Sequence, residues 1–396
     1  MRVGFFADEF LPRVDGVIVS MLNAAKGLRD LGHEVYFIVP KYPGTHSNEF
    51  TIRVSATSVP LSDNIRLMNP SRSVKRQIAG LNLDIIHSHT PLTAGLLARK
   101  SAAELGLPHV ATFHTLIPVI LDYYPLRSKA YFMPFLTALI SDLLWATDLR
   151  RYQVEAEAGS SAAKRWGWRI MAAYADGVDL VITPSTYYAQ RLRNLNISTP
   201  VKALSNAVDL TKFSKTESDG GKPLKLVAVG RLSAEKRQGA LVEALSKIDD
   251  RLVELTFIGD GPIKTELERA VRVRGLKNVT FTGKLMPERV TRILNQSDIG
   301  LLASHGFDTQ CIALIEYMAS GLPIIYCDDN LKEVVGDKAA LLTGPDAASI
   351  ARGVTKLAAD PLLRQKMSVA GLKRSRRYSI PKVALELEEI YKGLLG

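Results

Sequence analysis

The sequence predicts an α/β protein made of two Rossmann-like domains, each with a parallel sheet covered by helices on both faces. Three observations support this prediction. The chain has 396 residues, which is more than one hydrophobic core usually supports. Short apolar runs that are typical of buried strands alternate with segments of helical period. The alternation is interrupted once, at a polar and glycine-containing stretch, and then begins again.

The first series of elements begins at the N-terminus. We expect a strand over Arg2–Ala7 and then a helix from about Val17 to Leu31, closed by Gly32 as a C-cap glycine. Further expected elements of this series are strands at Val35–Val39, Asp84–His87, His109–Phe113 and Leu180–Thr183, and a helix at about Leu92–Leu105.

The second series follows the same pattern. It begins with a strand at Lys225–Val229 and ends with an amphipathic helix over about Ile380–Leu395. Between them we expect strands at Val253–Ile258, Val279–Thr282, Ile299–Ala303, Pro323–Tyr326 and Ala340–Leu342, and helices at about Gln238–Ile248, from Pro262 to about Arg274, and at about Thr309–Ser320.

The junction between the two series is Thr216–Pro223, which has the composition of a linker or exposed turn. We predict one domain over 1–204 and a second domain over 205–377. The last helix, about 378–396, is expected to pack back on the first domain. Ligands of open α/β sheets bind at the carboxyl ends of the strands, so the active site is expected in the cleft between two such domains.

Charge and cysteine content limit the classes of function. The formal net charge of +11 favours an anionic partner, which leaves open a nucleic acid, a phosphate-bearing substrate, an anionic membrane or simply a basic enzyme. No nucleic-acid motif accompanies the charge, so we expect no nucleic-acid partner. Two cysteines exclude a disulfide framework and favour a reducing, cytosolic setting. No signal peptide or long apolar run is visible, so any membrane association is expected to be peripheral.

Two segments carry residues suited to binding phosphates and sugars. In the first, Gly230 ends a strand, and Arg231 and Lys236 stand five apart on the loop that enters a helix, where both would neutralise a diphosphate. A solvated basic loop is the alternative. In the second, Asp308 precedes a helix that contains Glu316, so the two carboxylates are separated by just over two turns. The apolar neighbours of Glu316 argue against an ordinary solvated helix.

Together these segments resemble the retaining glycosyltransferases of the GT-B fold known as family 4. The motifs typical of that family stand here in the family's order, and weaker matches in the first half extend the resemblance to most of the chain. They are Gly230-Arg231-Leu232 with Glu235-Lys236, then Gly259–Pro262, then Phe281-Thr282-Gly283, and then Asp308 and Glu316 followed by Met318–Pro323.

The resemblance implies a nucleoside-diphosphate sugar as donor, which the domain over 205–377 would bind, and an acceptor, which the domain over 1–204 would bind. It also implies a role for each matching residue. Arg231 and Lys236 would hold the donor diphosphate, and Glu316 would bind the ribose hydroxyls. Asp308 would contact hydroxyls of the donor sugar. The remaining implied donor contacts come from the amides of Phe307, Asp308, Thr309 and Gln310, from the backbone around Gly283 and Lys284, and from Gly16. His114 would lie beside the reacting centre, so the implied catalytic set is His114, Asp308, Arg231 and Lys236.

The sequence departs from the family pattern at three positions. Asp308 replaces the usual Glu, and Cys311 stands where Gly is usual. Ala207, in the segment Asn206–Asp209, also replaces a Gly, which makes that turn less permissive. These changes bear on the identity of the donor sugar more than on the class of reaction.

A narrower resemblance, carried by the segments 87–91, 111–115 and 122–125, is to enzymes that glycosylate diacylglycerol or related membrane lipids. Arg72, Lys75 and Arg76 share one face of an expected helix. Residues 118–170 mix aromatic side chains with Lys and Arg, as suits a membrane interface. These aromatic residues are Tyr123, Tyr124, Tyr131, Phe132, Phe135, Trp145, Trp166 and Trp168. A basic surface helix and a helical insert packed on its own domain are the alternative.

The expected reaction transfers glucose from UDP-glucose to a membrane lipid such as diacylglycerol, with retained anomeric configuration, at the inner face of the cell membrane. A GDP-mannose-dependent lipid mannosyltransferase, a soluble glycosyltransferase and a non-catalytic binding protein are the alternatives. No strand-end DxD metal motif is evident, so we expect no obligatory divalent metal or other cofactor.

Overall fold

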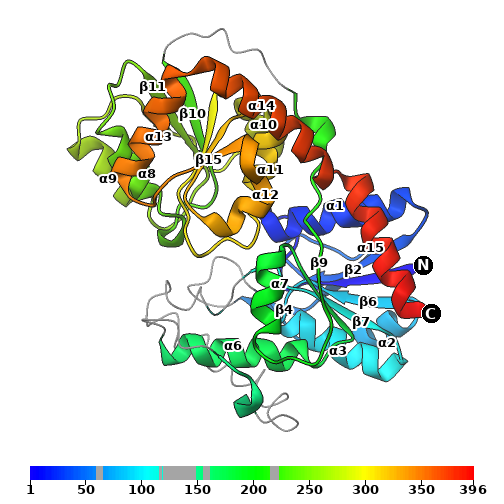
Figure 1. The fold of residues 1–396 in the computed structure, drawn as a ribbon. Helices are drawn as coiled ribbons and strands as arrows, with labels where there is room; N and C mark the ends of the chain where they lie inside the picture. Colours follow the sequence, from blue (N-terminus) through cyan, green and yellow to red (C-terminus); the bar gives the residue numbers. More distant parts are fainter. Residues whose placement is uncertain (59–65, 116–117, 119–148, 155–160, 215–222) are drawn as a thin grey trace. The chain divides into compact units, whose positions relative to one another are not determined.

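The computed structural model describes residues 1–58, 66–115, 118, 149–154, 161–214 and 223–396 (Figure 1). The chain divides into two compact units. Unit 1 comprises Met1–Ala207 and Ile380–Gly396, and unit 2 comprises Val208–Ser379.

Unit 1 is built on a seven-stranded sheet in the order β3-β2-β1-β6-β7-β8-β9, in which each strand runs parallel to its neighbour. A separate antiparallel pair joins β4 and β5. The strands are β1 (Arg2–Phe6), β2 (Glu34–Pro40), β3 (Thr51–Val54), β4 (Ala56–Ser58), β5 (Arg66–Met68), β6 (Ile85–Ser88), β7 (His109–Thr112), β8 (Leu180–Thr183) and β9 (Val201–Ala203). The helices are α1 (Gly16–Asp30), α2 (Arg72–Ala79), α3 (Thr93–Leu105), α6 (Ala162–Ala175), α7 (Thr186–Arg193) and α15 (Ile380–Leu395).

Side chains of unit 1 form one core on each face of this sheet. Phe5 packs with α1 and α15 on one face, whereas its neighbour Phe6 packs with α2 and α3 on the other. Because successive side chains of a strand point to opposite faces, a strand covered on both sides is apolar at every position. This explains the unbroken apolar run at the start of the chain.

Unit 2 repeats the plan with a six-stranded parallel sheet in the order β12-β11-β10-β13-β14-β15. The strands are β10 (Leu224–Val229), β11 (Val253–Ile258), β12 (Val279–Phe281), β13 (Ile299–Leu302), β14 (Ile324–Tyr326) and β15 (Ala340–Leu342). The helices are α8 (Gln238–Leu245), α9 (Lys264–Val273), α10 (Pro287–Asn295), α11 (Ile312–Ala319), α12 (Lys332–Ala339), α13 (Ala347–Ala359) and α14 (Pro361–Ser375).

The helices of unit 2 also cover both faces of its sheet. Helices α8, α9 and α13 pack in one core, and α10, α11 and α12 pack in the other. The predicted class, two Rossmann-like α/β domains, is confirmed.

The C-terminal helix α15 belongs to unit 1 and packs against α1, as Figure 1 shows for the red and blue helices. The two helices approach closely at Gly27, because a Cβ atom there would lie 2.6 Å from the Cβ of Ala384 and 2.9 Å from Ile380 Cγ2. A bare backbone at Gly27 therefore permits the contact.

We predict that Gly27→Ala destabilises the protein by about 1–3 kcal/mol, because the added methyl overpacks the contact between α1 and α15. Gly393→Ala is the matched control. It adds the same methyl group to α15 at a position with no atom within 4 Å, so it should be neutral or slightly stabilising. Urea unfolding of both variants measures the difference, and equal stability would show that α15 is not seated closely on α1.

Candidate functional site

The loops that follow β10, β11 and β12 in unit 2 are joined through their main chains. The amide of Leu232 donates to the carbonyl of Asp260 at 3.0 Å, and the amide of Gly259 donates to the carbonyl of Gly283 at 3.0 Å. Gly259 has a φ of 139°, and a Cβ atom on it would lie 2.0 Å from the carbonyl oxygen of Gly230. Only glycine permits this approach. Three motifs that are separate in sequence therefore form one structural cluster at the carboxyl ends of neighbouring strands.

Lys236 and Asp308 form an ion pair between the loop after β10 and the loop after β13. Lys236 Nζ lies 2.5 Å from Asp308 Oδ1, and the two side chains are only 19% and 9% exposed. The hydroxyl of buried Ser304 donates a second hydrogen bond to Asp308. Lys236 Nζ also lies 5.3 Å from the centre of the Phe307 ring. Two residues singled out by the sequence motifs are thus in direct contact.

The charge states of this cluster follow from its burial. Burial by itself lowers the pKa of Lys236, but the Asp308 carboxylate, together with Cys311 and Glu235, outweighs burial and holds the pKa above its usual value. The ammonium group therefore stays protonated. Burial, reinforced by Asp308, raises the pKa of the Cys311 thiol to about 12. Cys311 is consequently a neutral thiol at physiological pH, which is unsuited to nucleophilic attack.

The backbone at Cys311 corrects one boundary expected from the sequence. The helix expected to begin at Thr309 begins at Ile312, because Cys311 adopts a φ of 59° and a ψ of 94°, which no helix contains. This left-handed φ is easier for glycine than for a residue with a Cβ atom. Thr309 and Gln310 therefore lie in a buried loop ahead of α11, and not in its first turn.

Glu316 lies in the middle of α11. Burial raises the pKa of its carboxyl group to about 7, and Lys212 partly opposes that rise. The neighbouring Tyr317 holds α11 in place, since its hydroxyl accepts a hydrogen bond from the amide of Val229 at 2.7 Å. A Cβ atom on Gly300 would lie 2.5 Å from the Tyr317 ring, so β13 also fits closely against it.

Arg231 and Lys284, two further donor residues suggested by the sequence, lie on the same loops of unit 2. Arg231 is half-buried on the same loop as Lys236, and its carbonyl accepts a hydrogen bond from the Gln238 side chain at 2.7 Å. Lys284 is exposed beside Gly283. The loop after β13 is fastened by Asp328, whose carboxylate accepts from the amide of Gly306 at 2.7 Å.

Unit 1 carries a row of three histidines at the carboxyl ends of β6 and β7. His89 Nδ1 lies 3.1 Å from His114 Nε2, and the rings of His87 and His89 stack with centroids 4.2 Å apart. His87 is held on both sides, with Nδ1 2.6 Å from the hydroxyl of Tyr391 and Nε2 2.7 Å from that of Thr112. Tyr391 belongs to α15, so the C-terminal helix anchors this row.

All three histidines of the row are neutral at physiological pH. Burial is the main cause, and it lowers the pKa of His87 and His89 well below the usual value. Burial lowers the pKa of His114 to about 4, although a hydrogen bond with Asn206 and the charge of Asp15 partly oppose it. Asp15 caps α1, which begins at Gly16, and its carboxylate accepts from the amide of Ile18 at 3.1 Å.

Comparison with known proteins identifies the family. The profile named Glycosyltransferase Family 4 matches residues 14–212, and the profile named Glycosyl transferases group 1 matches residues 223–360. This chain belongs to glycosyltransferase family 4. It is a hexosyltransferase, as the resemblance of its motifs predicted.

The curated relatives of this family 4 enzyme do not all transfer the same sugar, according to their names. The α-monoglucosyldiacylglycerol synthase of Acholeplasma laidlawii is 27% identical over 84% of this chain and 81% of its own length. The GDP-mannose-dependent α-mannosyltransferase of Mycolicibacterium smegmatis is 26% identical over 100% of this chain and 98% of its own length.

Solved structures share the fold at low sequence identity. Sucrose-phosphate synthase from Thermosynechococcus elongatus superposes with a TM-score of 0.72 at 18% identity, covering 99% of this chain and 98% of that one. Anabaena HepE in complex with UDP-glucose superposes with a TM-score of 0.71 at 15% identity and covers both chains fully. These likenesses confirm the GT-B fold.

The residues predicted to meet a membrane are only partly described. On α2, Arg72 and Arg76 are exposed, whereas Lys75 forms an ion pair of 2.8 Å with Glu104 on α3. Tyr123 and Tyr124 lie outside the described residues, as do Tyr131, Phe132, Phe135 and Trp145.

The expectation that Trp168 lies at an interface is wrong. Its side chain is 3% exposed, because it packs inside unit 1 against Tyr188 and beneath the guanidinium of Arg191.

The described parts of the chain lack both a metal-binding cluster and a membrane-spanning helix. They contain no group of three or more His, Cys, Asp or Glu side chains arranged to hold a metal ion. They contain no helix that is both long enough and apolar enough to cross a membrane.

We predict that Glu316→Gln stabilises the protein in a pH-dependent way. The pKa of Glu316 is raised in the folded state to about 7, so ionisation opposes folding above the unfolded-state pKa of 4.5, and the penalty is complete only above pH 7. Since each pKa unit corresponds to about 1.4 kcal/mol, the gain at pH 8 should be on the order of 1–3 kcal/mol and much smaller at pH 5. Urea unfolding at both pH values measures it.

The matched control for this prediction is Glu386→Gln, which neutralises an exposed carboxylate on α15. Its effect on stability should be small and nearly the same at pH 5 and pH 8. If Glu316→Gln behaves in the same way, Glu316 is solvated and its assignment to a buried binding position is wrong.

Proposed function

We propose that this enzyme transfers a hexose, glucose in the first instance, from a nucleoside-diphosphate sugar to a hydroxyl of a membrane lipid such as diacylglycerol, with retention of anomeric configuration. UDP-glucose is the proposed donor. The observation that carries the proposal is the buried pair of Lys236 and Asp308, which stands beside the cluster of glycine loops in unit 2.

On the donor side, the proposed reaction depends on electrostatic stabilisation. As the bond to the sugar breaks, negative charge develops on the leaving diphosphate. Lys236 is permanently charged and already positioned, so it meets that charge with little reorganisation. Arg231 lies on the same loop and is assigned to the same diphosphate. Asp308 is placed to accept hydrogen bonds from sugar hydroxyls while it holds Lys236.

Glu316 is assigned to the ribose hydroxyls. A carboxylate at that position can accept two hydrogen bonds, and such donors stabilise the charged form of a half-buried carboxyl group whose pKa is raised to about 7 by burial. The contacts predicted for Gly283, Lys284, Phe307, Thr309 and Gln310 complete the proposed donor site. No divalent metal is assigned a part in it.

His114 is proposed to hydrogen-bond the donor sugar as a neutral imidazole. With a pKa of about 4 it carries no charge near pH 7, so it serves as a hydrogen-bond partner and not as a general acid. Its contact with His89 orients the ring. The backbone of Gly16 is proposed to lie close to the donor, as predicted from the sequence.

A lipid acceptor is favoured by the names of several relatives and by the exposed cations of α2. Two relatives are named α-monoglucosyldiacylglycerol synthase, and another, at 24% identity, is named phosphatidyl-myo-inositol mannosyltransferase. Arg72 and Arg76 offer two exposed cations that suit an anionic surface. We propose that the enzyme acts on the inner face of the cell membrane as a peripheral protein.

A GDP-mannose donor is the second candidate. The mannosyltransferase relatives match this chain at the same level of identity as the glucosyltransferases. The side chain of Asp308 is also one methylene shorter than that of the Glu usual in the family, and this changes the space available to the donor sugar. Parallel assays with UDP-glucose and GDP-mannose discriminate the two donors.

We predict that Lys236→Ala lowers kcat/KM for sugar transfer by about two orders of magnitude or more, because a preorganised cation is lost from the leaving diphosphate. Lys277→Ala is the matched control, since it removes an exposed lysine from the same unit. Transfer from UDP-glucose to diacylglycerol in detergent micelles provides the rate. A near-normal rate for Lys236→Ala would reject its diphosphate role, and an inverted anomeric proton in the product's NMR spectrum would reject retention.

We predict that replacing Arg72 and Arg76 together by Gln weakens sedimentation with vesicles that contain phosphatidylglycerol. Each cation near an anionic surface contributes about 1 kcal/mol, so the apparent affinity should fall by roughly tenfold or more. The control replaces Lys202 and Lys382 by Gln, which removes two exposed charges elsewhere in unit 1. Equal sedimentation of the two variants would show that α2 does not contact the membrane.

A further inference from the structure

Lys264 lies beside the proposed donor site, and none of the roles above uses it. It is the first residue of α9. A Cβ atom on Gly283 would lie 3.8 Å from Lys264 Nζ, so the ammonium group stands next to the bare backbone of that glycine. Gly283 has a φ of 69° and comes after β12, at a place where donor contacts are proposed. Lys264 therefore brings a cation to this end of the proposed site.

The main chain around Lys264 is fixed to the loop after β10. The amide of Ile263 donates to the carbonyl of Leu232 at 3.2 Å, and the amide of Lys264 donates to the carbonyl of Gly261 at 3.1 Å. A Cβ atom on Gly261 would lie 2.3 Å from the carbonyl oxygen of Leu232, so the two loops are in close contact. Helix α9 therefore begins at a fixed position, and Lys264 extends from a rigid support.

Lys264 keeps hydrogen-bonding capacity for a ligand. Its ion-pair partner is Asp260, but Nζ and Oδ2 are 4.0 Å apart, which is too far for a hydrogen bond. Within the parts of the chain that the structure describes, the ammonium group donates no hydrogen bond to another residue. An ammonium group carries three N–H donors. The side chain is 31% exposed, so a ligand can reach those donors from solvent.

The order of the strands places Lys264 on the base side of the proposed donor. Neighbouring strands of the sheet run β12-β11-β10-β13. Lys236, the proposed ligand of the diphosphate, follows β10, and Asp308, the proposed ligand of the sugar, follows β13. Sugar and nucleoside are attached to opposite ends of a diphosphate, so the base lies toward β11 and β12. Strand β12 is two strands, or roughly 10 Å, from β10, and Lys264 stands at its end.

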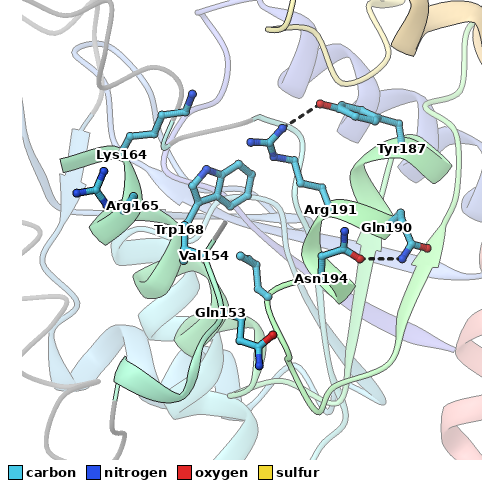
Figure 2. Close-up of a pocket in the computed structure, with 10 residues that line it drawn as sticks. Gln153, Val154, Lys164, Arg165, Trp168, Tyr187, Gln190, Arg191 and Asn194 are labelled. Carbon is cyan, nitrogen blue, oxygen red and sulfur yellow. Dashed lines mark hydrogen bonds between the residues drawn. The ribbon is translucent and has the colours of Figure 1, made fainter. Parts of the chain in front are cut away.

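A pocket in unit 1 is the alternative place for a nucleotide, and it is unsuitable. It lies between α6 and α7 and has a volume of about 210 Å³ (Figure 2), whereas pockets for drug-sized molecules occupy about 300–1,000 Å³. Arg191, which lines it, is already engaged. Its Nη1 donates to the hydroxyl of Tyr187 at 3.1 Å, and its Cζ lies 4.8 Å from the centre of the Trp168 ring. A nucleotide is therefore expected in unit 2.

We propose that Lys264 reads the base of the donor nucleotide, by donating a hydrogen bond to O4 of uracil or O6 of guanine. The inference rests on the proposed function, because it requires the diphosphate at Lys236 and the sugar at Asp308. Where uracil and guanine carry these carbonyl oxygens, cytosine and adenine carry an amino group, which is a donor. An ammonium group has only donors, so it pairs with the carbonyl and not with the amino group. The site thus selects uridine or guanosine nucleotides over cytidine and adenosine nucleotides.

The test compares UDP with CDP, which share their ribose and phosphates, by calorimetry on the full chain. The unmodified chain should bind UDP more tightly. Lys264→Met should raise the Kd for UDP about tenfold or more, because a hydrogen bond to a charged group is lost, and should leave the Kd for CDP nearly unchanged. Lys264→Arg keeps a cation and should retain part of the preference. The matched control is Lys277→Met, which removes an exposed lysine from the same unit and should bind both nucleotides like the unmodified chain.

The preference between bases separates this role from its alternatives. Equal weakening of UDP and CDP binding in Lys264→Met would mean that Lys264 acts on the phosphates or on folding, which circular dichroism verifies, and it would overturn the inference. Unchanged UDP binding in that variant would also overturn it. GDP and ADP give the same comparison for a guanosine donor.

Two further outcomes distinguish this inference from the proposed function. If Lys236→Ala weakens UDP binding and Lys264→Met does not, the proposed donor site stands and the role of Lys264 is wrong. If neither UDP nor GDP binds the unmodified chain, the proposed function is wrong and this inference falls with it.

Discussion

The contact between Lys236 and Asp308 is the interaction on which the proposed donor site of this enzyme depends. It joins two loops that leave different strands, and both side chains are largely withdrawn from water. Either charge alone would be costly to bury, so each requires the other. The bare backbone of Gly259 lets its loop approach the carbonyl of Gly230, and Tyr317 fastens α11 to β10. The charged pair therefore stands in a rigid frame that does not need a ligand to assemble it.

The ionisable residues of the proposed site differ in their charge states. The histidines of unit 1 are neutral and Cys311 is a protonated thiol, because burial disfavours the charged form of each. Lys236 keeps its charge because Asp308 compensates for burial. This pattern favours catalysis by fixed electrostatics and hydrogen bonding over covalent or proton-transfer chemistry.

Much of the fold was predictable because both sheets are buried on two faces. Strand β8 is a continuous apolar run and was located to the residue, as were β11 and β15. The start of α11 was missed, because the left-handed backbone at Cys311 is imposed by its surroundings and not by local composition. Motif order predicted that Lys236 and Asp308 are site residues, but it did not predict that they touch. The link from His87 to Tyr391 spans 304 residues, and no local pattern signals it.

The central claim is that the donor diphosphate binds at Lys236 and the ribose at Glu316. A crystal structure of the full chain with UDP bound tests it most directly. The account predicts a phosphate oxygen within hydrogen-bonding distance of Lys236 Nζ and both ribose hydroxyls at the Glu316 carboxylate. A nucleotide bound elsewhere, with the pair of Lys236 and Asp308 undisturbed and remote from it, would contradict the account.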